Sequence, residues 1–162
     1  MRQRRVIAGV LGATVLTAAA LRGVMRRFAI VEQSMAPALE PGDWVVAVRQ
    51  SGAIDRGDVV ITGDPTGSGM QLVKRVIGLP GEHLSIESGR VVIDGALLAD
   101  RWASGATRPE GSWAIPDGHV FLLGDNRGAS TSDSRIVGPI PIEALTWVVK
   151  AVYYPTARAR RL

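Results

Sequence analysis

Cysteine is absent from the 162 residues, and histidine occurs only twice, as His83 and His119. The lack of cysteine excludes disulfide scaffolds, thiol nucleophiles and cysteine-based zinc or iron–sulfur sites. Two histidines are too few for a histidine-rich metal cage, so we expect neither a metal nor any other cofactor. Lysine is scarce as well, since 17 arginines accompany only Lys74 and Lys150. Each lysine is therefore a candidate for chemistry that arginine cannot perform.

The basic residues are concentrated at the two ends of the chain. Residues 1–27 contain six arginines and no acidic residue, whereas residues 28–162 contain 13 basic and 15 acidic side chains. A second basic cluster is formed by Arg158, Arg160 and Arg161. Since no basic face with interleaved aromatic residues occurs in the body of the chain, the net charge of +4 does not predict a nucleic-acid partner.

Residues 6–21 form an uncharged, apolar run that follows an arginine-rich start. As a helix the run would span roughly 24 Å, and extension to Met25 with Arg22 at the headgroups would bring it to membrane thickness. We therefore predict one transmembrane anchor within residues 1–27. A cleavable signal peptide is the alternative, because alanines at 18–20 suit a cleavage site. The arginines directly after the run resist translocation and favour a retained anchor.

The body of the chain predicts a mostly β domain over residues 28–155, built of coiled, much-twisted antiparallel sheets. Sixteen of the chain's 19 glycines and all nine prolines lie there and separate short β-prone runs, and no segment after residue 30 sustains a helical period. The Gly-Asp steps that end at Asp43 and Asp58 are interpreted as ordinary hairpin turns. A hairpin and a Gly/Ser/Pro-rich loop predict a small flap at about residues 88–117. Residues 156–162 are expected to form a basic C-terminal tail. Strands are expected at residues 44–48, 59–62, 71–77, 84–86, 90–93, 120–123 and 146–154.

A serine and a lysine are the most economical nucleophile and base that this composition offers. Lys74 lies in an apolar run, where strand alternation would point it opposite to Arg75. A lysine buried in apolar surroundings can lose its proton near neutral pH, as a general base must. Ser34 precedes a proline-restrained turn that would present its hydroxyl rigidly. Taken singly, each residue also suits an ordinary turn or strand position.

Four ordered segments give the pair its context: SMAPALEPGD at 34–43, RGDVV at 56–60, KRVIGLPGE at 74–82 and GDNRGASTSDSR at 124–135. In sequence, order and spacing they resemble the motifs of type I signal peptidases, the membrane-anchored Ser–Lys endopeptidases. The resemblance covers about residues 28–155. It implies that Ser34 is the nucleophile and that neutral Lys74 is its general base.

The same resemblance implies roles for residues around the pair. Asp133 and Arg135 would form a structural ion pair, and Ser130 would orient Lys74. Because the fourth segment is one residue longer than the usual form, Thr131 and Ser132 remain alternatives to Ser130. Glu32 stands where some members have a serine that donates to the oxyanion, so the second oxyanion donor is left open. Asp125 and Asn126 are expected as further supporting residues, and Met35, Pro37 and Val73 as substrate contacts.

The resemblance implies an endopeptidase that cuts exported preproteins after small residues of the Ala-X-Ala type. Its partners would be preprotein signal peptides and the lipid bilayer, with a single membrane pass and the catalytic domain on the extracytoplasmic side. A specialised maturation protease with one or few substrates is an alternative. The others are a non-catalytic, membrane-tethered β-domain and a Ser-His-Asp enzyme that uses His83 or His119.

Overall fold

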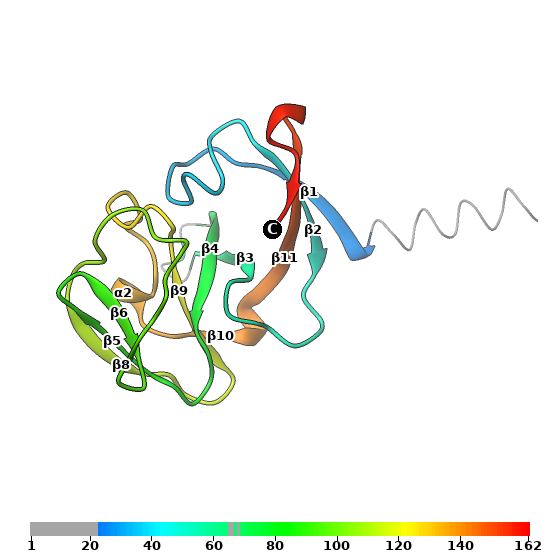
Figure 1. Cartoon of the computed structure of the whole chain (residues 1–162). Coiled ribbons are helices and arrows are strands. Elements are labelled where there is room, and N and C mark those ends of the chain that lie inside the picture. The colour runs from blue at the N-terminus through cyan, green and yellow to red at the C-terminus, as the bar shows by residue number, and fades with distance from the viewer. Residues whose placement is uncertain (1–22, 65–66, 68) are drawn as a thin grey trace, which may run out of the picture.

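A computed structural model of the chain describes residues 23–64, 67 and 69–162, which fold into two antiparallel sheets (Figure 1). Three short helical turns accompany them: α2 (Ser134–Val137), η1 (Ile142–Ala144) and η2 (Thr156–Arg158). The larger sheet has the order β1 (Met25–Ala29), β2 (Trp44–Arg49), β11 (Leu145–Tyr154), β3 (Val59–Gly63), β4 (Gln71–Gly78), β9 (His119–Leu123) and β10 (Ile140–Pro141), with β12 (Arg160–Arg161) paired to β11. The smaller sheet has the order β7 (Ala96–Leu97), β6 (Arg90–Ile93), β5 (His83–Glu87) and β8 (Gly111–Ala114).

The mostly β, antiparallel class predicted from the sequence is confirmed. Each strand expected from the alternating runs is present, with bounds shifted by one or two residues at most. The sheet begins earlier than residue 28, because β1 starts at Met25 and pairs with β2 along its whole length. The guanidinium groups of Arg26 and Arg27 stack on the rings of Phe28 and Tyr153, so these arginines belong to the folded domain.

The segment expected to be a small flap is a sheet with its own core. It starts at His83, five residues earlier than predicted, and includes β8, which the sequence did not indicate. Alternate side chains of β5 and β6 point inward, and Leu84, Ile86 and Val91 pack against Phe121 of β9. Because this apolar face is buried against the larger sheet, the segment is fixed to the domain.

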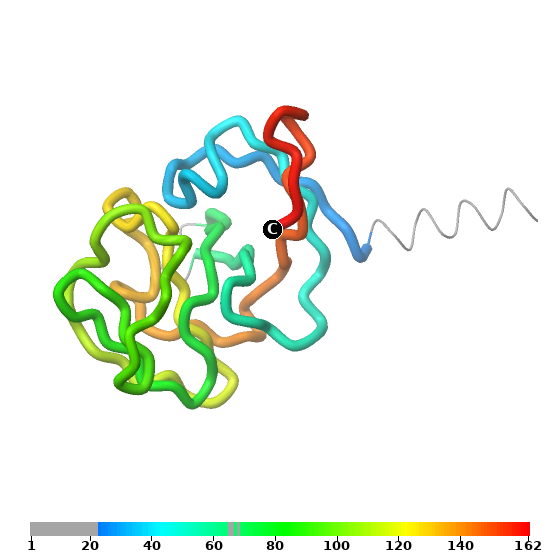
Figure 2. Tube along the Cα trace, viewed as in Figure 1, coloured from blue at the N-terminus to red at the C-terminus, as the bar shows by residue number. Residues whose placement is uncertain are grey.

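The basic residues after Tyr154 are also folded. They form η2 and β12, and β12 pairs with β11 through Val152↔Arg160 and Ala151↔Arg161. Figure 2 shows this C-terminal segment in red beside the loop that follows β1. The predicted tail is therefore packed against the domain.

The anchor predicted for residues 1–27 falls mainly on residues 1–22, which lie outside the described part of the chain. Within the described part, no helix has the length and apolar character needed to cross a membrane.

Candidate active site

Ser34 lies in the loop between β1 and β2, at residues 33–43, which we call the nucleophile loop. Turn hydrogen bonds shape it, from the amide of Ala36 to Gln33 O at 3.0 Å and from that of Leu39 to Met35 O at 2.8 Å. The side chains of Met35 and Leu39 are buried in the core between the loop and the strands β2, β3 and β11. Burial of these two side chains anchors the loop, as the proline-restrained turn predicted.

Lys74 reaches Ser34 from the middle of β4. Its Nζ lies 3.0 Å from Ser34 Oγ, and the two residues are only 3% and 7% exposed. The neighbouring Arg75 bonds Asp125 and Gly57 O instead. The structure thus brings together the serine and the lysine that the sequence singled out, and it separates the two adjacent cations as strand alternation requires.

Burial lowers the pKa of the Lys74 ammonium below its ordinary value, because the charged form loses its hydration. The charges of Asp133 and Glu32 oppose this and raise the pKa, while that of Arg135 lowers it. Desolvation is the largest of these causes, so the balance favours the neutral amine relative to a solvated lysine.

A buried network centred on Asp133 lies beside Lys74. Arg135 donates to both carboxylate oxygens of Asp133, from Nε and Nη2 at 2.8 Å each. The Ser130 hydroxyl donates to Oδ2 at 2.7 Å and the Gly124 amide at 3.2 Å. Burial raises the pKa of Asp133, but the hydrogen bonds from Arg135 and Ser130 outweigh it, and the pKa lies below its ordinary value. The carboxylate is therefore held in its charged form.

The three candidates for orienting Lys74 differ in their surroundings. The Ser130 hydroxyl is directed to Asp133 rather than to Lys74, and Thr131 is exposed. Ser132 shares with Lys74 the lining of a small cavity of about 10 Å³. Ser130 thus contacts Asp133, and the negative charge of Asp133 is one of those that raise the pKa of Lys74.

The first residues of the segment at 124–135 contact the backbone of Ser34. The amide of Asn126 donates to Ser34 O at 3.0 Å, and Asp125 forms a buried two-bond ion pair with Arg75 at 2.8 and 2.6 Å. Gly124 is packed so tightly that an added Cβ would lie 2.6 Å from Ser34 O. This close approach was not identified from the sequence, although Gly124 belongs to the quoted motif.

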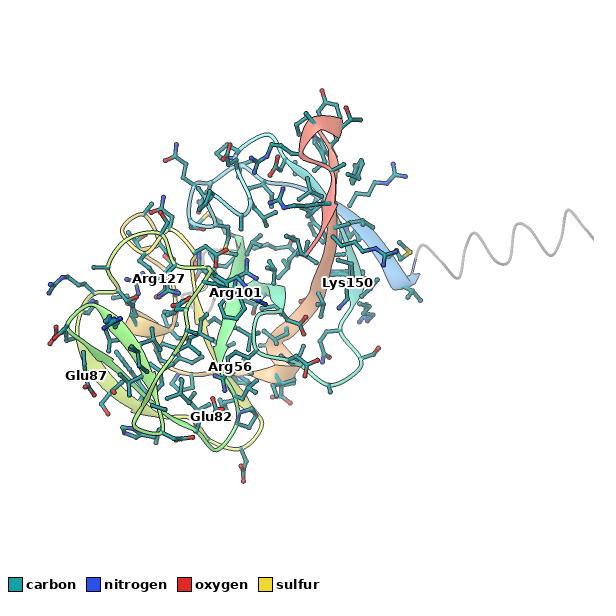
Figure 3. All side chains as sticks on the ribbon, in the orientation of Figure 1. Arg56, Glu82, Glu87, Arg101, Arg127 and Lys150 are labelled. Carbon is teal, nitrogen blue, oxygen red and sulfur yellow. The ribbon has the colours of Figure 1, made fainter. Side chains whose placement is uncertain are left out.

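Arg127 connects the site to the smaller sheet. It is 1% exposed and lies in the loop between β9 and α2, where Figure 3 labels it. It donates to Gly124 O at 3.0 Å, to Thr107 Oγ1 at 2.5 Å and to Asp100 Oδ2 at 2.5 Å. Asp100 and Thr107 carry no sequence signal, because only the packing of the smaller sheet brings them here.

A groove of about 230 Å³ opens beside Ser34. Met35 and Val73, two of the expected substrate contacts, line it together with Ile30 and Glu32. Pro37, the third, is not among the lining residues, and its carbonyl accepts a hydrogen bond from Arg158 instead. The turn carries Pro37 away from the groove because Met35 and Leu39 face the core.

Neither histidine contacts the pair. His83 Nε2 lies 2.8 Å from Ser112 Oγ on the smaller sheet, and His119 Nδ1 lies 3.0 Å from Asp117 O. Both contacts are exposed, and the structure gives neither histidine a hydrogen bond to Ser34 or an ion pair with an acid within the described ranges. The geometry therefore gives no support to a Ser-His-Asp arrangement there.

Comparisons with known proteins agree with this picture. A family model described as "Signal peptidase, peptidase S26" matches residues 3–154. Signal peptidase I of Bacillus amyloliquefaciens is 30% identical over 163 residues, which covers 89% of this chain and 84% of the relative. The mitochondrial ATP-independent inner membrane protease subunit 1a of Arabidopsis thaliana is 36% identical over 112 residues, 67% of this chain and 58% of that protein.

A solved structure shares the fold. The crystal structure of a signal peptidase I from Enterococcus faecalis superimposes with a TM-score of 0.52 at 25% identity. The match covers 59% of this chain and 96% of the other.

Proposed function

The chain belongs to the signal peptidase family and is a peptidase of the type I class, and from this premise we propose that it is a membrane-anchored Ser–Lys endopeptidase. It would remove signal peptides from exported preproteins after Ala-X-Ala type residues. The observation that carries the proposal is the 3.0 Å separation of Lys74 Nζ and Ser34 Oγ in a buried site.

The proposed reaction begins with a proton transfer. Neutral Lys74 accepts the Ser34 hydroxyl proton as the oxygen attacks the scissile carbonyl, and the resulting ammonium gives that proton to the leaving amine. The acyl-enzyme is then hydrolysed by a water that Lys74 activates. The depressed pKa of Lys74 supports this role, because an amine that is already protonated cannot act as a base.

Oxyanion stabilisation is assigned to the backbone amide of Ser34, which donates to no carbonyl among the described residues. The position two residues before the nucleophile holds Glu32, and an ionised carboxylate has no hydrogen-bond donor to offer the oxyanion. The hydrogen bond from the Asn126 amide to Ser34 O fixes the peptide plane that follows Ser34, and so helps to keep the nucleophile in place.

The substrate is proposed to bind as an added strand against β4. Hydrogen bonds from Asp64 N to Met70 O and from Val76 N to Asp58 O set the ladder with β3. Since ladder bonds alternate along a strand, Gln71 and Val73 direct their backbone groups away from β3, towards the groove. Strand β9 pairs with β4 only from Arg75 onwards, so this edge is open for an extended peptide.

Selectivity for small residues would follow from the groove. Ile30, Met35 and Val73 are fixed by the core, and a volume of about 230 Å³ shared by several substrate residues leaves little space for each. Large side chains next to the scissile bond are then rejected by steric clash.

The membrane part of the proposal depends on residues 1–27, with the catalytic domain on the extracytoplasmic side and a single pass through the cell membrane. It is supported by the apolar run at 6–21, which shortly precedes β1 in the sequence, and by the position of Ser34 in the loop that follows β1. A cleavage segment presented at the bilayer surface would then meet the groove.

The test uses the full chain in detergent with a preprotein substrate. Ser34→Ala, Lys74→Ala and Lys74→Arg are each expected to lose at least about a hundredfold in cleavage rate. Lys150→Arg is the matched control and should cut like the parent. Retained cleavage in Lys74→Arg would contradict a neutral-amine base. Loss in His83→Ala or His119→Ala would point to a histidine mechanism, and no cleavage by any form would point to a binding domain.

A maturation protease with one or few substrates is a second candidate, and the chain is also similar to a protein named as an inner membrane protease subunit rather than as a signal peptidase. A panel of unrelated preproteins distinguishes the two. A general signal peptidase cuts most members of the panel, whereas a maturation protease cuts one or a few.

A further inference from the structure

The last residues of the chain fold onto the outer half of the nucleophile loop, more than a hundred positions away in sequence. Figures 1 and 2 show the C-terminal segment beside the loop that links β1 to β2. Its arginines make the contacts. The inner half of the same loop carries Ser34, which the Asn126 amide holds through its carbonyl. The loop is thus held from two sides by unrelated parts of the chain.

Arg158 is the centre of the outer contact. Its Nε lies 2.9 Å from Asp43 Oδ1 and its Nη2 lies 3.1 Å from Oδ2, which makes a two-bond ion pair. The same Nη2 donates to Pro37 O at 3.2 Å, and Nη1 lies 3.3 Å from Glu40 Oε1. Arg160 adds a hydrogen bond to Ala38 O. A planar guanidinium suits this set of acceptors, because its donors point in fixed directions.

Asp43 is the residue of the nucleophile loop whose carboxylate binds Arg158. It closes the turn by accepting from the Glu40 amide at 3.0 Å, and its side chain is 2% exposed. Burial raises the pKa of Asp43, but the hydrogen bonds from Arg158 and from the Glu40 amide outweigh it, and the pKa lies below its ordinary value. A buried carboxylate needs a cation beside it, and the C-terminal segment supplies one. Asp43 therefore does more than form the hairpin turn expected from the sequence.

We propose that Arg158 is a positioning residue, which acts through Asp43 and the carbonyl of Pro37 to hold the nucleophile loop with Ser34 Oγ at Lys74. The proposal rests on the function proposed above. It gives residues 156–162 a role in the reaction, although none of them lines the groove beside Ser34.

Positioning and stability are separated by comparing variants. The Arg158 side chain is 30% exposed, but that of Asp43 is 2% exposed, so loss of Arg158 alone leaves a buried carboxylate without its cation and also destabilises the domain. A displacement of the nucleophile by about 1 Å, in contrast, reduces the rate of the chemical step roughly a hundredfold. Replacement of Asp43 by asparagine together with Arg158 by glutamine removes the buried charge, so a loss of kcat in that folded variant reports positioning rather than stability.

The experiment compares Arg158→Gln, Asp43→Asn and the double variant with the parent, using the full chain in detergent. Arg161→Gln is the matched control, because Arg161 is exposed in the same C-terminal segment, on β12, and has no side-chain hydrogen bond within the described residues. Arg158→Gln is expected to lower kcat by roughly tenfold to a hundredfold, with KM within about twofold of the parent. The double variant should be no worse than the more severe single one.

Two further measurements identify the cause. The acid limb of the kcat profile should stay at the same pH, since Arg158 is not among the charges that shift the pKa of Lys74, and thermal unfolding measures how much of each variant is folded at the assay temperature. Arg158→Lys keeps the charge but not the paired donors, and should recover part of the lost kcat. This variant also keeps the test decisive if Arg158→Gln unfolds.

Parental kcat in Arg158→Gln would overturn the proposal, as would a loss equal to that of Arg161→Gln or one explained by unfolded protein. This failure is distinguishable from failure of the proposed function. If Ser34→Ala is inactive while Arg158→Gln cuts like the parent, the Ser–Lys mechanism stands and only the positioning role is refuted.

Discussion

A methyl group added at Gly124 tests the packing that holds the nucleophile against its partners. The Cβ of Gly124→Ala would lie 2.4 Å from both Cβ and Oγ of Ser130 and 2.6 Å from Ser34 O, whereas ordinary contact begins at 3.4 Å. Relief of these overlaps requires movements of about 1.0 Å at Ser130 and about 0.8 Å at Ser34. Misplacement on this scale costs roughly a hundredfold in rate, or about 2.7 kcal/mol in the barrier.

The assay measures kcat on a preprotein for Gly124→Ala, with Gly128→Ala as the control. Gly128 lies in the same loop, and a Cβ there would meet nothing within 4 Å. The control should retain parental kcat. Both proteins are also unfolded in urea, because overpacking at Gly124 is expected to cost about 1–3 kcal/mol of stability. Parental kcat in folded Gly124→Ala would refute the claim that this contact fixes Ser34.

Three further predictions concern charge and burial. Lys74→Met abolishes cleavage but raises the free energy of unfolding measured in urea at neutral pH, because burial disfavours the charged amine of the folded parent. Between the lowered pKa of Lys74 and 10.5 the unfolded parent binds more protons than the folded one, so the stability of the parent rises with pH across that window and the gain from methionine shrinks. Glu32→Gln lowers the pKa of Lys74 and moves the acid limb of kcat/KM to lower pH, while Glu143→Gln leaves it in place. Arg127→Leu leaves the carboxylate of Asp100 without its cation and destabilises the domain by about 3 kcal/mol in urea unfolding; an unchanged midpoint would contradict this.

The strands were predictable because their apolar residues alternate. Strand β4 shows how far this extends, since alternation alone separates Lys74 from Arg75 and directs one to Ser34 and the other to Asp125. Strand β8 was missed because glycine, serine and alanine surround its single large residue, Trp113. It forms a strand because it pairs with β5. Strands β10 and β12 are two residues long and exist only through pairing.

The candidate site was predictable where the four quoted segments cover its residues. The Ser34–Lys74 pair and the Asp133–Arg135 ion pair were both implied by the resemblance that these segments carry. The contacts of Arg127 with Asp100 and of Arg158 with Asp43 join distant segments, and no local pattern marks them. The hydrogen bond from the Ser130 hydroxyl to Asp133 also required the three-dimensional arrangement, because the sequence left Ser130, Thr131 and Ser132 as alternatives.

The central claim is that the amine of Lys74 is neutral at the pH at which the enzyme works. The chain has only two lysines, so a protein labelled with ¹³C at the lysine ε-carbon gives two signals, and Lys150→Arg assigns the one from Lys74. Titration of that signal in the folded, full-length protein measures the pKa directly. The account predicts a pKa below 10.5 that coincides with the acid limb of kcat/KM. A pKa above that limb would contradict it.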